Sequence, residues 1–510
     1  MKHRLLYIRI LPFLLITIML ALRCSHAPPQ YLNLAPHVAY TGDASCASCH
    51  AKIAETYQQT GMGRSLYRPA REQIIETFDP ETVVLDSHSG YAYHPYWSGD
   101  RMYIREFRLA GSDTTYRRDE EVNYVVGSGH QTRSYLLDRK GYLYEAPITW
   151  YVDKGIWDLS PGYENGHNSR FAREIGEECL ACHTGNFNYV EGSKNRFHAI
   201  GLGIDCERCH GPGEVHIKAI EGGQLIDVGE EIDYTIVNPG KLPIERQFDV
   251  CQQCHLQGVN VFKAGESMRA FRPGMALNEV AAIFIERQAD PEAFGIASHA
   301  ERLQASRCFI ESAGRLTCTT CHDPHKSISV TDSLVYIRQC SGCHQAQKQP
   351  LCTASARQQA QMGGNCISCH MPGGGTRDIP HVSFHDHKIR VVREESQYVS
   401  EQEKAFLKLV CATDTAPTGD IQGRAWLQYF ERHDPDTAHL RRAARLLDPA
   451  NDAYRARLAY YQGDLPAALG HADAEGEQQL GGGPAGRTHL AHGGERPGGV
   501  EAQPAHRGLG

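Results

Sequence analysis

Fourteen cysteines of this chain share one pattern, in which two cysteines separated by two residues are followed directly by a histidine. Chance placement of 18 cysteines and 27 histidines in 510 residues would give about 0.03 such strings. Two thiols at this spacing can add to the two vinyl groups of a porphyrin, and the adjacent histidine then reaches the iron as proximal ligand. The pattern therefore predicts seven covalently bound haem c groups. The motifs, numbered in chain order, are Cys46/Cys49/His50, Cys179/Cys182/His183, Cys206/Cys209/His210, Cys251/Cys254/His255, Cys318/Cys321/His322, Cys340/Cys343/His344 and Cys366/Cys369/His370.

Zinc is the main alternative to haem, because Cys-x-x-Cys pairs from different parts of a chain commonly combine into tetrahedral sites. Disulfides are a second alternative if the chain is exported. Neither requires a histidine directly after every second cysteine, so the repeated histidine favours haem. Outside the motifs stand Cys24, Cys308, Cys352 and Cys411, and a bridge between Cys308 and Cys352 stays open.

The motifs are dense along the chain. From Cys179 to His370, 192 residues carry six motifs, or about 32 residues for each haem. So short a segment cannot enclose each haem in a conventional protein core, so we expect the haems themselves to form the core. Short helices, long loops and little sheet are predicted for this part.

Seven haems need seven distal ligands if every iron is six-coordinate. His216 follows His210 by six residues and His325 follows His322 by three, so neither can easily reach the far face of the haem that its own motif holds. We expect each to bind the iron of a neighbouring haem, which would lock haems into pairs. The histidines available outside the motifs are His37, His88, His94, His130, His167, His198, His216, His299, His325, His381, His385 and His387.

Three strings carry a family resemblance. The segments 206–216 (CERCHGPGEVH), 316–325 (LTCTTCHDPH) and 369–372 (CHMP), the last followed by His381 and by FHDH at 384–387, resemble the multihaem cytochrome c superfamily. That superfamily includes tetrahaem cytochromes, the hydroxylamine oxidoreductases of nitrifying bacteria and pentahaem nitrite reductases. The resemblance spans roughly residues 42–392 and looks closest to exported members with a helical repeat tail. It implies a mostly α and irregular fold with the haems as core, and candidate distal ligands at His216, His325, His381, His387 and His299, to which we add His198 and His130.

The segment after the first motif departs from the family pattern. Where the family often has a histidine about a dozen residues after the motif, this chain has Met62. A thioether ligand raises the potential of a haem relative to a second imidazole, so Met62 is a candidate distal ligand of a high-potential haem. Plain apolar packing of Met62 against a haem face is the alternative.

The interval between the first and second motifs has another character. It is rich in tyrosine and holds Trp97, Trp150 and Trp157. Residues 122–126 alternate, and residues 134–137 and 142–145 bracket a turn at 138–141, so we predict a β-rich aromatic insertion over 82–165. This insertion separates a first-haem segment, 42–81, from a six-haem segment, 166–392. Its surface could serve a substrate or partner, but a structural role in covering haem edges is the simpler interpretation.

Beyond the motifs the amino-acid composition is typical of helices. Residues 396–470 contain AARLLDP at 443–449 and GDLPAAL at 463–469, which look like parts of tetratricopeptide helix pairs. Residues 471–510 are rich in glycine without an apolar period, so they are predicted to be disordered. A truncated or frame-shifted reading of a longer tail would also explain the loss of pattern.

Charge and the first residues bear on location. The formal net charge of −8 and the pI near 6.4 give no global attraction to nucleic acid. Three basic residues, Lys2, Arg4 and Arg9, precede a 13-residue apolar run at 10–22. This pattern predicts an export signal over residues 1–24. Cleavage, lipidation at Cys24 and an uncleaved membrane anchor stay open. We expect a periplasmic or cell-surface protein.

Electron transfer between redox donor and acceptor proteins is the first functional hypothesis, because mainly bis-histidine haems have no free coordination site. An oxidoreductase acting on nitrite, hydroxylamine or tetrathionate would need one haem with an open distal face and nearby acid–base groups, and no catalytic residue can be assigned. All seven motifs end in histidine, whereas the family's nitrite reductases have lysine in one motif. In a third hypothesis the helical tail docks the chain into a larger respiratory complex.

Overall fold

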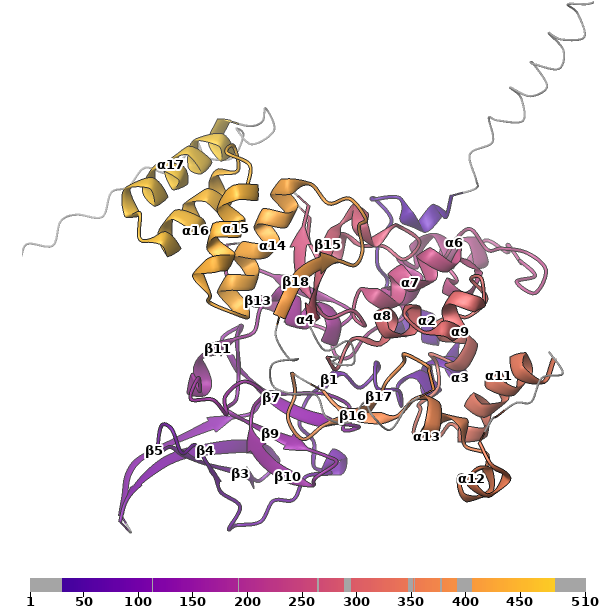
Figure 1. Cartoon of the computed structure of the whole chain (residues 1–510), viewed down its shortest axis with the longest axis horizontal. Coiled ribbons are helices and arrows are strands. Elements are labelled where there is room, and N and C mark those ends of the chain that lie inside the picture. The colour runs from indigo at the N-terminus through magenta and orange to yellow at the C-terminus, as the bar shows by residue number, and fades with distance from the viewer. Residues whose placement is uncertain are drawn as a thin grey trace, which may run out of the picture. The chain divides into compact units, whose positions relative to one another are not determined.

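The computed structural model describes residues 30–481 except 112, 191, 264–265, 289–294, 347–351, 353, 377 and 392–405 (Figure 1). The chain divides into two compact units, Met1–Pro417 and Thr418–Gly510, and all seven motifs belong to the first unit. The predicted export signal lies outside the described residues. Within the described residues, no helix has both the length and the apolar character that crossing a bilayer requires.

Antiparallel strands occupy the interval between the first two motifs, as predicted. One sheet has the order β2–β3–β4–β5, and a second follows the path β1–β6–β7–β8–β11, with β9 paired to β7 and β10 to β9. Their shared core is aromatic and includes Tyr93, Tyr135 and Trp157. The β-rich segment extends past the predicted limits, because β1 and β11 flank it. The strands are β1 Leu66–Tyr67, β2 Val84–Leu85, β3 Ala92–Ser98, β4 Arg101–Ala110, β5 Asp113–Glu121, β6 Tyr124–Val126, β7 Thr132–Arg139, β8 Tyr142–Glu145, β9 Ile148–Tyr151, β10 Ile156–Leu159 and β11 Arg173–Glu174.

The hairpin predicted around residues 138–141 is confirmed. Strand β7 pairs with β8, and Arg139 lies opposite Tyr142. The two turn residues, Lys140 and Gly141, have φ angles of 58° and 88°, as a two-residue turn matched to strand twist requires. The Gly141 amide donates to the Asp138 carboxylate at 2.7 Å, which fixes the turn.

Gly141→Ala tests how tightly this turn is packed. An added Cβ would lie 2.6 Å from the Phe197 carbonyl oxygen in a left-handed backbone, so we expect a loss of about 2 kcal/mol or more in the free energy of unfolding. Gly99→Ala is the matched control, because Gly99 has φ 58° with nothing within 4 Å and should lose only about 1 kcal/mol. Equal losses in urea unfolding would contradict the close contact.

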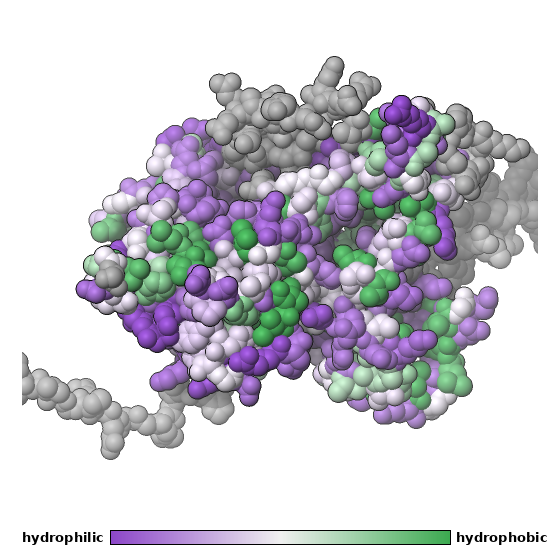
Figure 2. All heavy atoms as spheres, turned by 90° about the horizontal axis from the view of Figure 1, so that it is seen from below, coloured by the Kyte–Doolittle hydropathy of each residue, from purple (hydrophilic) through white to green (hydrophobic). Residues whose placement is uncertain are grey.

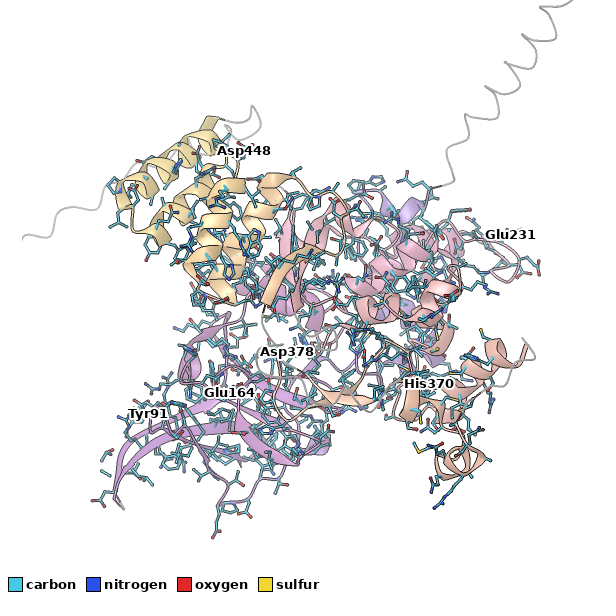
Figure 3. All side chains as sticks on the ribbon, viewed as in Figure 1. Tyr91, Glu164, Glu231, His370, Asp378 and Asp448 are labelled. Atoms are coloured by element: carbon cyan, nitrogen blue, oxygen red, sulfur yellow. The ribbon has the colours of Figure 1, made fainter. Side chains whose placement is uncertain are left out.

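Each motif lies in, or at the end of, a short helix, as predicted. A single helical turn places the two cysteines of a motif on one face, three residues apart. The seventh motif, whose His370 is labelled in Figure 3, forms the short helix α13. The helices of this part are α2 Asp43–Ala47, α3 Ala51–Tyr57, α4 Glu177–His183, α5 Glu207–His210, α6 Glu214–Glu221, α7 Ile244–Gln252, α8 His299–Gln304, α9 Arg307–Glu311, α10 Cys318–Cys321, α11 Ser333–Ala346, α12 Ala356–Gln361 and α13 Cys366–His370.

From Cys179 to His370 the described residues form short helices and loops, as predicted, with only the four strands β12 to β15 among them. Together with strands beyond His370 these form three small antiparallel sheets, and one of them, β14–β15–β18, has its own apolar core around Phe271, Leu277 and Ile283. The structure therefore contains both helices and antiparallel sheets. Conventional packing thus accounts for part of this interior. The strands are β12 Phe187–Tyr189, β13 Phe197–Ile200, β14 Val259–Phe262, β15 Ala281–Gln288, β16 Gly373–Gly375, β17 Ser383–His385 and β18 Phe406–Cys411.

The second unit consists of two helix pairs in its described part. Helix α14 (Gly419–Arg432) packs on α15 (Thr437–Leu446), and α16 (Asp452–Gln462) packs on α17 (Leu465–Gly481). Side chains of Thr418, Asp436 and Asn451 cap the first three helices. Two predicted limits are corrected: the helical segment 396–470 contains strand β18, and α17 continues through residue 481 into the segment predicted to be disordered. The tetratricopeptide likeness stays a prediction.

The surface seen in Figure 2 carries apolar side chains in several patches separated by polar residues. Exposed apolar residues of the β-rich segment include Val83, Leu85 and Leu109. Isolated residues of this kind are usual on soluble protein surfaces and indicate no particular partner.

Candidate haem sites

Thiols of different motifs lie against one another. All cysteines within the described residues are free thiols, including Cys308 and Cys352. Hydrogen bonding to the Cys206 thiol lowers the pKa of Cys46, and the same contact raises the pKa of Cys206. The chain therefore brings attachment cysteines from distant motifs together. The thiol pairs are Cys46 with Cys206, Cys182 with Cys254, and Cys251 with Cys318.

Several attachment side chains are exposed in the described part of the chain. The expectation that the haems form the core stays a prediction. Neither α2, of the first motif, nor α13, of the seventh, buries any residue, because helices this short carry few apolar side chains that could pack on the rest of the chain. The sixth motif, near the end of α11, is exposed at both its second cysteine and its histidine. The exposed attachment residues are Cys49, His50, Cys179, His255, His322, Cys343, His344 and Cys369.

This exposure differs from motif to motif. The third motif has no exposed attachment residue, whereas the first and sixth expose two each. Protein side chains therefore cover the attachment residues of the third motif more than those of the first and sixth. Haem attachment at all seven motifs stays a prediction from their sequence.

Some of the motif histidines are prepared to bind a metal through Nε2. The Nδ1 of His210 bonds the Val237 carbonyl at 2.8 Å, and that of His370 bonds the Arg390 carbonyl at 3.0 Å. A carbonyl can only accept, so Nδ1 carries the proton and Nε2 keeps its lone pair. Burial lowers the pKa of His183, His210 and His255, which favours the neutral, ligating form.

One predicted distal ligand faces a motif histidine from another site. The rings of His210, in the third motif, and His325, after the fifth, are 6.0 Å apart and nearly parallel at 16°. Two imidazoles bound to opposite faces of one iron by bonds of about 2 Å have ring centres roughly 6 Å apart. This pair thus fits the crossed ligation expected for His325.

Four further histidines gather in a second cluster. His322 of the fifth motif stacks with His387 at 6.2 Å and 29°. His255 of the fourth motif contacts the edge of His299 at 5.2 Å, and His299 lies 4.9 Å from His387. Burial lowers the pKa of His299 to about 2 and that of His387 to about 4, so both are neutral. The arrangement fits His387 as partner of the fifth motif and His299 as partner of the fourth.

A buried ion pair holds this second cluster together. Arg302, one turn after His299 in α8, donates from Nε to Asp386 at 2.8 Å, and Arg390 donates to the same carboxylate. The carboxyl side chain is only 2% exposed. Because Asp386 directly precedes His387, the pair fixes the segment that carries His387 to the helix that carries His299. Sequence reasoning missed this pair, although an aspartate between two candidate ligands was a usable signal.

Other predicted ligands lie in different surroundings. His381 bonds Asp158 of the β-rich segment through Nε2 at 2.8 Å and packs on Tyr151, so the atom that would bind iron is engaged elsewhere. His216 has Nδ1 at 3.0 Å from both Thr235 Oγ1 and Asp233 Oδ2, which leaves Nε2 available.

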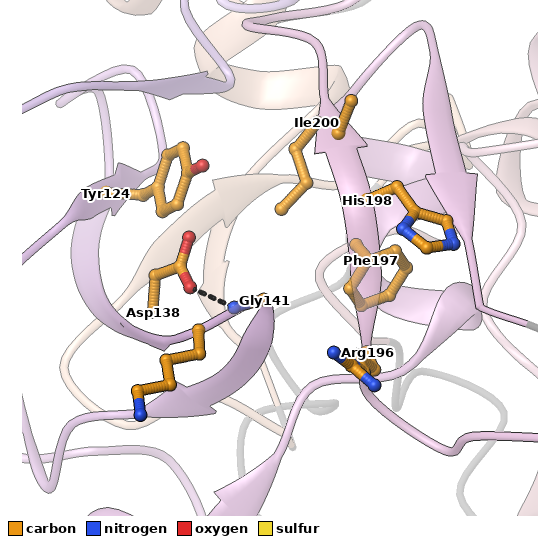
Figure 4. A pocket seen from close by; sticks show the side chains of 9 residues that line it. Tyr124, Asp138, Gly141, Arg196, Phe197, His198 and Ile200 are labelled. Atoms are coloured by element: carbon orange, nitrogen blue, oxygen red, sulfur yellow. Dashed lines mark hydrogen bonds between the residues drawn. The ribbon is translucent and has the colours of Figure 1, made fainter.

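His198 and the segment around Met62 complete the set. His198 is exposed on β13, at a pocket of about 290 Å³, and its ring points away from Tyr124 and Asp138 (Figure 4). His130 lies beside Gly61, with 3.7 Å between its Cδ2 and the position of an added Cβ there. Met62 is half-buried, and its carbonyl accepts from Ile204. The roles of His198, His130 and Met62 stay predictions.

Three features fit covalently attached haem: the motif cysteines are free thiols, short helical turns align them, and the Nε2 atoms of His210 and His370 are available to bind iron. The motif cysteines would hold each haem by thioether bonds, and the motif histidine would bind its iron. Within the described residues, no three His, Cys, Asp or Glu side chains converge in a metal-binding geometry of their own.

Comparison with known proteins agrees with this fit. The family model described as cytochrome c554 and c-prime matches residues 162–211, which contain the second and third motifs. The multiheme cytochrome MtrA of Shewanella baltica (strain OS185) is 24% identical over 209 residues, or 40% of this chain and 47% of that protein. Together with the motifs, these matches support a multihaem c-type cytochrome. Such a protein carries covalently bound haem c and transfers electrons.

The extent of these matches is limited. This chain spans about half the length of MtrA. Among solved structures, the outer cell wall cytochrome OcwA aligns over 86% of this chain and 99% of its own, with 14% identity and a TM-score of 0.43.

Proposed function

We propose that this chain is an exported cytochrome with seven haems that passes electrons along one continuous array. The observation that supports the proposal most is the contact between thiols of different motifs. The first motif meets the third through Cys46 and Cys206, and the second meets the fourth through Cys182 and Cys254. Haem supplies one-electron transfer at such sites, and short separations favour it.

The remaining sites extend the same series. Cys251 and Cys318 connect the fourth motif with the fifth. After the larger effect of burial, the charge of Cys254 raises the pKa of Cys209, that of Cys340 raises the pKa of Cys321, and that of Cys366 raises the pKa of Cys340. In line with these neighbours, we propose a series that runs from the first motif through the third, fourth, fifth and sixth to the seventh, with the second joining at the fourth.

Proteins that donate or accept electrons would dock at the ends of this series. We propose the first motif for one end, the seventh for the other and the second as a side branch, and the exposure of Cys49, Cys369 and Cys179 at these motifs accords with access for a partner. The helical second unit is a further proposed docking element, and export to the periplasm or cell surface accords with the predicted signal at residues 1–24.

Protein-film voltammetry of the haem-loaded chain tests electron transfer against enzymatic turnover. We expect reversible waves from all haems over a broad potential range, with no added current when nitrite, hydroxylamine or tetrathionate is supplied. A catalytic current with one of these substrates would replace the proposal with that of an oxidoreductase with an open haem.

A further inference from the structure

The Nδ1 atom of His216 lies beside a carboxylate. It is 3.0 Å from Asp233 Oδ2 and 3.0 Å from Thr235 Oγ1. The other carboxylate oxygen, Asp233 Oδ1, accepts from the Thr235 amide at 2.8 Å and from the Thr235 hydroxyl. Because that hydroxyl donates its single proton to Asp233, its oxygen can only accept from His216. Nδ1 of His216 therefore carries the proton, and Nε2 keeps the lone pair that can bind iron.

The three side chains are largely shielded from water. The side chains of His216 and Asp233 are 21% and 9% exposed, and Thr235 is buried. The backbone between Asp233 and Thr235 is held in place, since the Tyr234 carbonyl accepts from the Leu32 amide at 2.7 Å. A charge in such surroundings is screened less than one on an open surface. The Asp233 carboxylate thus acts on the imidazole from a defined position.

Other candidate ligands have neutral partners at the same atom. Backbone carbonyls at 2.8–3.0 Å accept from the Nδ1 atoms of His210 and His387. Asp323 lies 3.6 Å from Nδ1 of His325, which is beyond hydrogen-bonding distance. A carboxylate carries a full negative charge, so it draws the proton of His216 further from the ring than a carbonyl would. The imidazole then becomes a stronger electron donor to its metal, which stabilises ferric over ferrous iron.

We propose that Asp233, held by Thr235, orients His216 and lowers the potential of the haem that His216 binds. Asp233 is a positioning residue, because it acts on the iron through the imidazole. The inference rests on the proposed function and adds to it a difference in potential between haems of the array. A haem of lower potential gives up its electron more readily, so the proposed contact favours electron flow away from this haem.

Redox titration and electron paramagnetic resonance of the haem-loaded full chain test the inference. His216→Gly locates the haem concerned, because its iron should become high-spin and its potential should change. In Asp233→Asn the same haem should stay low-spin, and its reduced form should be favoured at least about tenfold more, a rise of about 59 mV for one electron. Asp227→Asn is the matched control, because it removes the same charge from an exposed loop nearby and should leave every potential unchanged.

A second variant keeps the test decisive if Asp233→Asn does not fold. The serine of Asp233→Ser can still accept from the Thr235 amide two residues on, but it carries no charge, so the same potential should rise. A wholly low-spin His216→Gly protein would overturn the proposal. So would equal potentials of the located haem in the Asp233 and Asp227 variants of a chain that carries seven haems, and this result would leave the proposed function standing. A chain without haem would contradict the proposed function itself.

Discussion

Asp386→Ala is expected to lower the free energy of unfolding by about 3–5 kcal/mol, because it removes the buried carboxylate that forms an ion pair with Arg302. Glu311→Ala is the matched control, since Glu311 pairs with Arg307 on the exposed side of α9. It should cost less than about 1 kcal/mol. Chemical denaturation of the haem-loaded proteins measures both losses.

The Asp386 carboxylate also makes the stability of the fold depend on pH. Burial alone would raise the pKa of Asp386, but hydrogen bonds from Arg302, the Lys388 amide and Arg390 lower it below its ordinary value. A carboxyl group with a lowered pKa stabilises the fold above its unfolded-state pKa, and this contribution is lost as the pH falls through the folded-state pKa. Asp386→Ala should therefore flatten the loss of stability in acid. An unaltered acid profile would show that Asp386 is not a main determinant.

His325→Gly is expected to change the iron ligation of one haem of the seven. Its ring stacks with His210, so its removal should leave the iron of the third motif without its distal imidazole. We expect a new high-spin signal in the electron paramagnetic resonance spectrum and a raised potential for that haem in a redox titration.

His198→Gly serves as the control for this change, because His198 is exposed on β13 and is also a histidine outside the motifs. Its spectrum should match that of the unchanged chain. An entirely low-spin His325→Gly protein would mean that another side chain, or no side chain, binds opposite His210.

The candidate attachment sites could be proposed from the sequence because their chemistry is local. Two cysteines and a histidine within five residues determine where a haem is bound, whatever the rest of the chain does. The hairpin at residues 138–141 could also be predicted, since its turn is formed by residues that are adjacent in the chain. Resemblance also indicated that His325 and His387 are ligand candidates.

Contacts between segments that are far apart in the chain could not be predicted from the sequence in this way. Strand β18 pairs with β15 across more than 100 residues, and its sequence lies within a stretch of helical composition. The bond between His381 and Asp158 joins two segments far apart in the chain, which no local pattern reports. The buried pairing of Arg302 with Asp386 likewise depends on tertiary packing.

Burial of the motifs was also beyond what the sequence could predict. Seven nearly identical strings gave no reason to expect that His50 and His344 are exposed while His210 is half-buried. The difference comes from which distant segments pack on each short helix.

Mass spectrometry of the intact mature protein, produced in a host able to attach haem, tests the central claim most directly. The account predicts a polypeptide carrying seven haem masses that resist acid and organic extraction, one for each Cys-x-x-Cys-His motif. A colourless product with the mass of the polypeptide alone would contradict it.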